Sequence, residues 1–140
     1  MRPQQADERT VTRPFKATCV TIEEDADRWL VGFADAEFNA TRYLLLQRLK
    51  SPEAEDISLG LDGYHVEVDD QSSSCYGGIT SFELYSDCAI VAFDREAAAV
   101  LGDESVMVVE FALRPKQLDQ LRDGLARIFA VDECFFDRNG

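Results

Sequence analysis

One histidine and several acidic side chains share a short segment in the middle of the chain. Residues 64–69 alternate apolar and polar side chains, as a β-strand does when one face is buried and the other is in water. The polar face carries His65, Glu67 and Asp69, and His65 is the only histidine in the sequence. An imidazole beside two carboxylates can bind a metal ion, transfer a proton or contact a basic partner. The alternation alone leaves these three possibilities open.

A polar corner follows this strand and leads to the Gly77-Gly78 pair. Turns favour Asp, and glycine permits positive φ, so a structural turn accounts for part of this pattern. The remainder fits a binding surface, because carboxylates pair with Lys and Arg and because tyrosine is enriched at interface hot spots. The predicted partner-binding residues are His65, Glu67, Asp69, Asp70, Gln71 and Tyr76.

Catalytic interpretations of the same residues are weaker. A metal site on His65, Glu67 and Asp69 would draw three ligands from one strand, and no fourth ligand can be identified. A hydrolytic site would join His65 to a nucleophile within residues 72–75, but no nucleophile elbow or oxyanion signature accompanies them. We predict no catalytic residue, no metal and no cofactor. A small metal- or ligand-binding enzyme centred on His65, Glu67 and Asp69 remains the alternative.

The net charge of the chain limits the classes of partner that it can bind. The 140 residues include 14 basic and 27 acidic side chains, for a net charge of -13. Binding to nucleic acid or to an anionic membrane requires clustered Lys and Arg, so we predict neither partner. A strongly acidic protein meets a basic partner quickly, although high acidity also serves solubility. The longest apolar runs are too short to span a membrane.

The cysteines indicate a reducing compartment. Cys19, Cys75, Cys88 and Cys134 form no Cys-x-x-Cys pair, so a structural zinc site is not expected. We predict that all four are thiols. Residues 1–12 lack the apolar core of a signal peptide, and the expected location is the cytoplasm.

The hydrophobic pattern predicts an α+β fold with one mostly antiparallel sheet of about six or seven strands and two helices in the C-terminal part. Residues 1–14 are expected to be a flexible leader, and residues 15–140 a single domain. The candidate strands are residues 19–22, 29–34, 43–49, 57–61, 64–69, 79–85, 88–93 and 106–113, and the helices are residues 95–101 and a longer one from Pro115.

The longer helix should close the core. Its apolar stripe consists of Leu118, Leu121, Leu125, Ile128 and Phe129. Gly124 lies within this helix, where glycine costs about 1 kcal/mol relative to alanine. The aromatic pair Phe135-Phe136 near the end of the chain either tucks under the sheet or adds to a partner surface.

The central segment also resembles a known family. The run Tyr64-x-Val66-Glu67-Val68-Asp69-Asp70-Gln71, followed by Tyr76-Gly77-Gly78-Ile79, is similar to the Immunity protein 10 family of bacterial polymorphic-toxin systems. The flanking runs Tyr43-Leu44-Leu45-Leu46-Gln47-Arg48 and Ala97-Ala98-Ala99-Val100-Leu101-Gly102 are similar as well, so that the resemblance covers residues 17–130.

This resemblance implies an immunity protein that binds a cognate toxin domain and blocks it by occlusion. A basic toxin would complement the acidity of this chain. The sequence leaves open whether the protein is a monomer or a homodimer. A protein-interaction module that binds a partner unrelated to toxins remains a further alternative.

Overall fold

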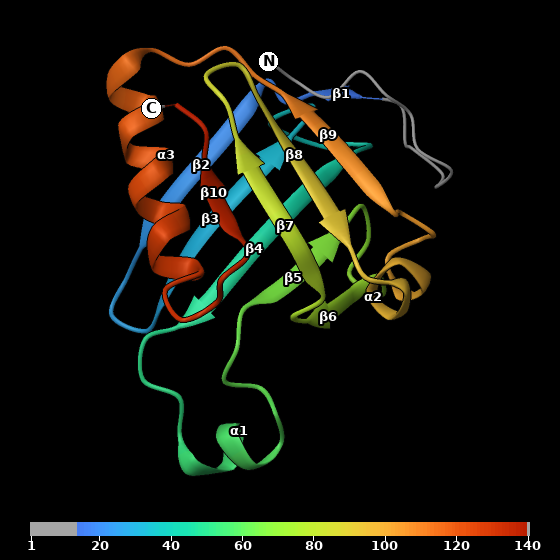
Figure 1. Ribbon diagram of the computed structural model, residues 1–140, viewed down its shortest axis with the longest axis vertical. Coiled ribbons are helices and arrows are strands. Elements are labelled where there is room, and N and C mark those ends of the chain that lie inside the picture. The colour runs from blue at the N-terminus through green and yellow to red at the C-terminus, as the bar shows by residue number, and fades with distance from the viewer. Residues whose placement is uncertain (1–13, 140) are drawn as a thin grey trace.

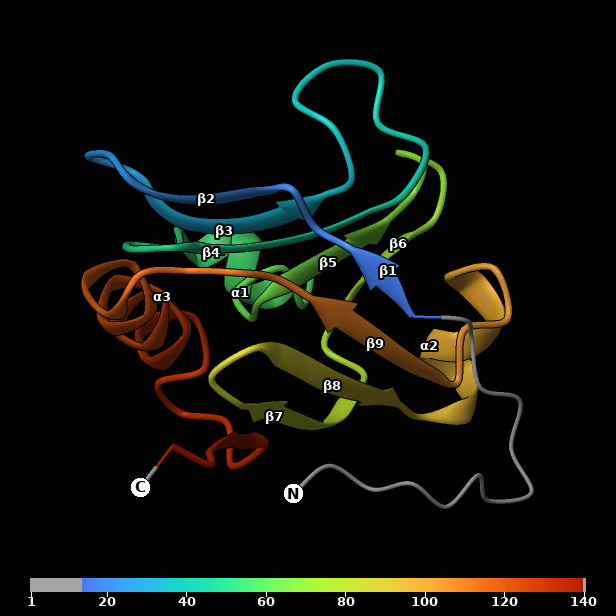
Figure 2. The same cartoon turned by 90° about the horizontal axis from the view of Figure 1, so that it is seen from above.

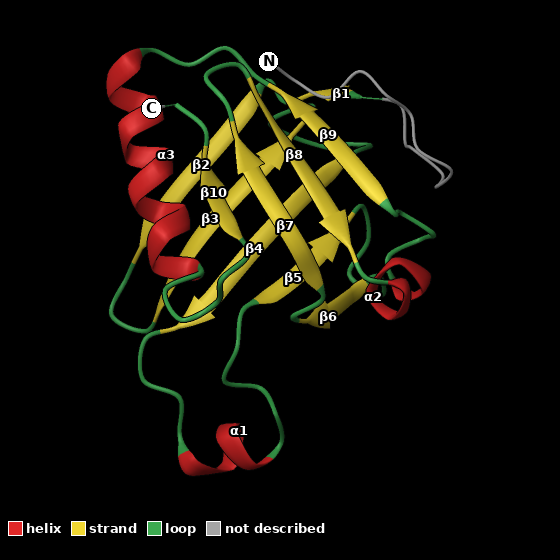
Figure 3. Cartoon of the chain, in the orientation of Figure 1, coloured by secondary structure: helices red, strands yellow, loops and turns green. Residues whose placement is uncertain are grey.

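The computed structural model describes residues 14–139, which form two β-sheets and three helices (Figures 1 and 3). Apart from Pro14, the predicted leader lies outside the described residues. The strands are β1 (Phe15–Lys16), β2 (Cys19–Glu24), β3 (Arg28–Ala34), β4 (Tyr43–Leu49), β5 (His65–Val68), β6 (Ser74–Tyr76), β7 (Ile79–Leu84), β8 (Cys88–Phe93), β9 (Val106–Glu110) and β10 (Phe135–Asp137). The helices are α1 (Ala54–Ser58), α2 (Arg95–Val100) and α3 (Pro115–Ile128).

The two sheets have different topologies. The first runs β2-β3-β4-β5-β6 in chain order and is antiparallel throughout, and we call it the meander sheet. The second has the order β1-β9-β8-β7-β10. Its central strands are antiparallel, whereas the short strands β1 and β10 pair in parallel at its edges, and we call it the mixed sheet.

The sheets face each other, with the hydrophobic core between them (Figure 2). Phe33 of the meander sheet lies 6.4 Å from Phe82 of the mixed sheet and 6.0 Å from Phe111, measured between ring centroids. The α+β class is therefore confirmed, but the prediction of one sheet with about six or seven strands is wrong. The alternation of apolar and polar residues shows which face of a strand is buried, but it does not show which sheet the strand joins.

The chain passes from the mixed sheet to the meander sheet between β1 and β2, and it returns to the mixed sheet at Gly77-Gly78. Both residues have positive φ, 73° and 93°, between the end of β6 and the start of β7. A Cβ atom on Gly78 would also collide with the Cβ of Ala97 in α2. Glycine is therefore required here both for the backbone conformation and for the close approach of α2.

Both predicted helices are present. Asp94 caps α2, because its carboxylate accepts a hydrogen bond of 2.8 Å from the backbone N–H of Ala97. Leu121, Leu125 and Ile128 of α3 are fully buried and pack toward the meander sheet. Gly124 has a role that the sequence analysis missed. It lies so close to the sheet that a Cβ atom would be 3.0 Å from Ile22 Cγ2 and 3.2 Å from Val31 Cγ2.

Residues 51–63, which we call the 51–63 arm, leave the meander sheet between β4 and β5 (Figure 1). The arm contains the one-turn helix α1, and its residues 57–61 do not form the predicted strand. The neighbouring strand β4 is already paired with β3 on one side and β5 on the other. It therefore offers no free edge to which another strand could add.

Of the aromatic pair near the C-terminus, one ring is partly buried against the core, as one of the two predictions had it, and the other is exposed. Phe135 packs into the core, with its ring 6.2 Å from that of Phe82 and 6.0 Å from that of Phe129. Phe136 is 37% exposed and lies under the guanidinium group of Arg138. Among the described helices, none is both long and apolar enough to cross a membrane.

Candidate partner-binding site

Strand β5 has the two faces that the sequence predicts. Tyr64, Val66 and Val68 are buried in the core, at 4%, 0% and 1% exposure. His65 and Glu67 are partly exposed and lie on the outer face of the meander sheet. β5 is held between β4 and β6, so these two side chains project from a rigid strand.

His65 and Tyr76 form an aromatic pair at one end of this face. They are opposite each other in β5 and β6, and their rings meet edge to face with centroids 4.9 Å apart. Tyr76 is 43% exposed, although the core lies behind its strand. A pocket of about 240 Å³ adjoins the pair and is also lined by Leu61 and Gly63 at the base of the 51–63 arm.

Glu67 lies in the middle of the face and already has a partner. The Tyr43 hydroxyl in β4 donates a short hydrogen bond to its carboxylate. Burial, followed by this contact with Glu67, raises the pKa of Tyr43 above its usual value, so the phenol stays protonated and remains a donor. The Glu67 carboxylate is thus held in one position between its cross-strand neighbours Leu45 and Ser74.

Asp69 does not lie on this face, contrary to the prediction. It follows the end of β5 with φ 65°, in the left-handed region, and this turns its side chain away from the strand alternation. Its carboxylate accepts a hydrogen bond of 2.9 Å from the backbone N–H of Tyr43 and forms an ion pair of 3.2 Å with Arg42. Asp69 therefore links the end of β5 to the start of β4.

Arg42 joins Asp69 to a second acidic residue that the sequence gave no reason to select. Its guanidinium group also forms a short ion pair with Glu104, which is only 7% exposed. Burial raises the pKa of Glu104, while the nearby Arg42 acts in the opposite direction. Arg42 and Glu104 are 62 positions apart in the sequence, and neither stands in a recognisable motif.

Asp70 and Gln71 lie at the turn after β5 and are exposed. The Asp70 carboxylate accepts a weak hydrogen bond of 3.3 Å from the backbone N–H of Ser72, its only hydrogen bond or ion pair within residues 14–139. The predicted residues thus extend in a row along β5, with His65 and Tyr76 at one end, Glu67 in the middle, and Asp70 and Gln71 at the other. At a rise of about 3.3 Å per residue, β5 itself spans roughly 10 Å from His65 to Val68, and Asp70 lies beyond the turn that ends it. Such a row fits a docking surface better than a reaction centre.

The proposed metal ligands do not converge, and the thiol among the proposed nucleophiles lies on the opposite face from His65. Within residues 14–139, no group of three or more His, Cys, Asp or Glu side chains is placed to hold a metal ion, which agrees with the displacement of Asp69. All four cysteines are thiols. Cys75 is opposite the buried Val66 and shares its inner face, whereas His65 lies on the outer face. Burial also raises the pKa of Cys75, and this disfavours the reactive thiolate.

The model of the family described as Immunity protein 10 matches residues 16–119. The chain belongs to the Immunity protein 10 family. The match includes all six predicted site residues, so the resemblance drawn from the sequence is confirmed. It ends within α3, and the rest of this Immunity protein 10 domain, including β10, packs into the same core. A comparison with curated proteins gave no match.

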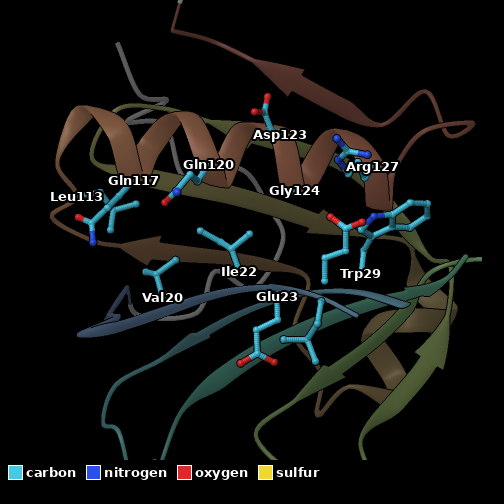
Figure 4. Close-up of a pocket in the computed structure, with 12 residues that line it drawn as sticks. Val20, Ile22, Glu23, Trp29, Leu113, Gln117, Gln120, Asp123, Gly124 and Arg127 are labelled. Carbon is cyan, nitrogen blue, oxygen red and sulfur yellow. The ribbon is translucent and has the colours of Figure 1, made fainter. Parts of the chain in front are cut away.

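This family member also has a larger pocket that the sequence analysis did not select. It has a volume of about 440 Å³ and lies between α3 and the β2–β3 hairpin (Figure 4). Its walls combine apolar, acidic, amide and basic side chains, a mixture that does not indicate one class of ligand. They include Val20, Ile22, Glu23, Trp29, Leu113, Gln117, Gln120, Asp123 and Arg127.

Proposed function

We propose that this chain is an immunity protein that binds a cognate toxin domain and neutralises it by occlusion. Membership of the Immunity protein 10 family supports this function at the level of the family. The observation that carries the proposal for this chain is the exposed Tyr76 ring, which packs on His65 beside an acidic row on rigid strands. A tyrosine that is fixed in place but still exposed has the properties of an interface anchor.

The partner should present a basic face. The net charge of -13 favours fast association with a cationic surface. Asp70 is exposed and has little bonding within the described residues, so a Lys or Arg of the partner can pair with it. Binding would place the toxin against β5 and β6, where the bulk of this chain would block access to the toxin's active site. The four thiols are consistent with action in the cytoplasm.

The structure changes how site variants should be designed. Asp69 holds Arg42 and Tyr43, so a substitution there tests the fold as well as the interface. Tyr76→Ala removes a ring that is 43% exposed and contacts His65 within the site, and Asp70→Asn removes an exposed charge. Glu67→Gln keeps an oxygen that can accept the hydrogen bond from Tyr43. Asp119→Asn removes an exposed charge on α3 and serves as the charge-matched control.

The experiment takes a candidate toxin domain from the genes that neighbour this one and expresses it together with each variant. Growth of the cells and the Kd of the purified pair are measured. Tyr76→Ala should weaken binding by roughly 30-fold or more, the effect of losing a hot-spot residue. Asp70→Asn should mainly slow association and reduce its dependence on salt. Wild-type affinity in Tyr76→Ala, Asp70→Asn and Glu67→Gln would reject this site. Failure of the wild-type protein to bind or rescue would reject the function itself.

A further inference from the structure

The 51–63 arm exposes apolar side chains that the fold does not use. It projects away from both sheets (Figure 1), and α1 contributes no buried residue. Ile57 is 55% exposed and Leu59 is 63% exposed. Two large apolar side chains on one projecting segment gain nothing from exposure to solvent, and exposed apolar surface of this kind is typical of binding surfaces.

The arm has an ordered backbone of its own. The N–H of Glu53 donates to the Asp56 carboxylate at 2.8 Å, and the N–H of Ile57 donates to the Glu53 carbonyl at 3.0 Å. The N–H of Leu61 then donates to the Asp56 carbonyl at 2.8 Å, past Gly60 at φ 74°. Because these backbone groups are satisfied within the arm, Ile57 and Leu59 are presented in a defined geometry.

The charge of the arm is entirely negative. Between Ser51 and Gly63 the sequence contains four carboxylates and no Lys or Arg. The acidic residues are Glu53, Glu55, Asp56 and Asp62. This arrangement selects a basic partner and disfavours a second copy of the same chain, whose arm would carry the same charge.

The arm is continuous with the proposed toxin-binding face. Leu61 and Gly63 at its base line the pocket of about 240 Å³ that His65 and Tyr76 close from the strand side. The acidic arm, the pocket and the exposed Tyr76 ring are therefore contiguous. The pocket is open and of a size that suits a single inserted side chain, and its lining is mixed, with Leu49 and Leu61 beside Arg28, Gln47 and Arg48. Arg48 is paired with Asp132, so the attraction for a basic face comes from the carboxylates of the arm and not from the pocket.

We infer that the 51–63 arm is the second half of the toxin-binding surface. It receives a basic face of the toxin domain that carries a protruding apolar or aromatic side chain. That side chain enters the pocket between Leu61 and Tyr76, while Ile57 and Leu59 cover its flank and the four carboxylates pair with Lys or Arg around it. This inference rests on the proposed function and adds to it the position and chemistry of the contact.

The topology permits a direct test, because the arm can be removed without opening either sheet. β4 and β5 are antiparallel neighbours, with Gln47 opposite His65, so a short connection can join them. One variant replaces residues 52–61 with a four-residue Gly-Ser linker. This variant keeps Lys50, whose backbone N–H donates to the Asp27 carbonyl. A second variant, Ile57→Ser with Leu59→Ser, keeps the full chain length.

The matched control is Phe136→Ser, which removes an exposed apolar ring from the mixed sheet. Urea unfolding should show that both arm variants retain the stability of the wild type. Titration of the same candidate toxin domain should give a Kd at least ~10-fold weaker for each arm variant, because truncation of a hot-spot side chain weakens binding by at least this factor. The control should bind like the wild type.

The outcomes separate the inference from the function on which it rests. Wild-type affinity in the folded double variant, together with weakened binding in Tyr76→Ala, overturns the role of the arm and leaves the proposed function intact. No binding by the wild-type chain overturns both. Sedimentation of the chain without toxin adds one further outcome. A dimer that Ile57→Ser with Leu59→Ser converts to monomer would assign the arm to self-association instead.

Discussion

Gly124→Ala should destabilise the protein, although alanine is the better helix former. Gly124 lies inside α3, and the substitution gains about 0.8–1 kcal/mol in helix propensity. The added methyl group would lie 3.0 Å from Ile22 Cγ2 and 3.2 Å from Val31 Cγ2, closer than ordinary van der Waals contact. The balance between these effects decides whether the helix truly rests on the sheet at this position.

The steric cost should be the larger effect. Ile22 and Val31 are β-branched and stiff at χ1, and they are opposite each other in paired strands. Val31 is fully buried, so it has little room to move. Overpacking of this kind costs about 1–3 kcal/mol, and subtracting the gain in propensity leaves a net loss of about 0–2 kcal/mol. We expect a loss of about 1 kcal/mol in the free energy of unfolding.

Urea unfolding of a double-mutant cycle provides the assay. In an Ile22→Ala background, which is itself destabilised by the lost isoleucine side chain, the closer of the two contacts is removed. Gly124→Ala should there become neutral or stabilising, which gives a coupling energy of about 1 kcal/mol or more. If Gly124→Ala instead stabilises the otherwise wild-type protein by about 1 kcal/mol, the helix does not approach the sheet so closely, and the reasoning is refuted.

Three further predictions follow from the fold. Leu125→Ala should lower the free energy of unfolding by about 2–5 kcal/mol in the same urea assay, since Leu125 is fully buried, and a change within about 0.5 kcal/mol would place α3 off the core. The Thr41 hydroxyl and the backbone N–H groups of Arg42 and Thr41 hold the pKa of Asp35 below its usual value. The resulting stabilisation is present above the unfolded-state pKa and is lost as the pH falls through the lower folded-state pKa. Asp35→Asn should therefore reduce the loss of stability on acidification below about pH 4. An unchanged dependence of stability on pH would contradict this prediction. Thiol titration of the unfolded, unreduced protein should find all 4 cysteines reactive, and a lower count with air oxidation excluded would reveal a disulfide.

Most of the longer strands and both longer helices were predicted from the sequence because their signals are local, whereas the short elements β1, β6, β10 and α1 were not. β4 and β8 have the predicted bounds, and Asp94 caps α2 as its position before the alanine run indicates. The division of the strands into two sheets could not be predicted from the sequence. A strand shows the same alternation whichever sheet it joins. The return of the chain to the mixed sheet depends on the positive φ of two glycines, and hydrophobic periodicity does not predict φ.

The candidate site was also predicted only in part. His65 and Glu67 share a face as predicted, because both lie within β5. Asp69 was misplaced because the alternation rule holds only while the strand continues, and the left-handed backbone at Asp69 ends it. The contact between Arg42 and Glu104 had no sequence signal at all. It joins two loops that only the assembled fold brings together.

Hydrogen–deuterium exchange of this chain with and without its cognate toxin domain tests the central claim most directly. The account predicts that the toxin slows exchange in the segment from the 51–63 arm through Tyr76, and that β2 and α3, which flank the larger pocket, stay unchanged. Protection confined to β2 and α3, with none in residues 51–76, would contradict the account and move the toxin-binding surface to the pocket beside α3.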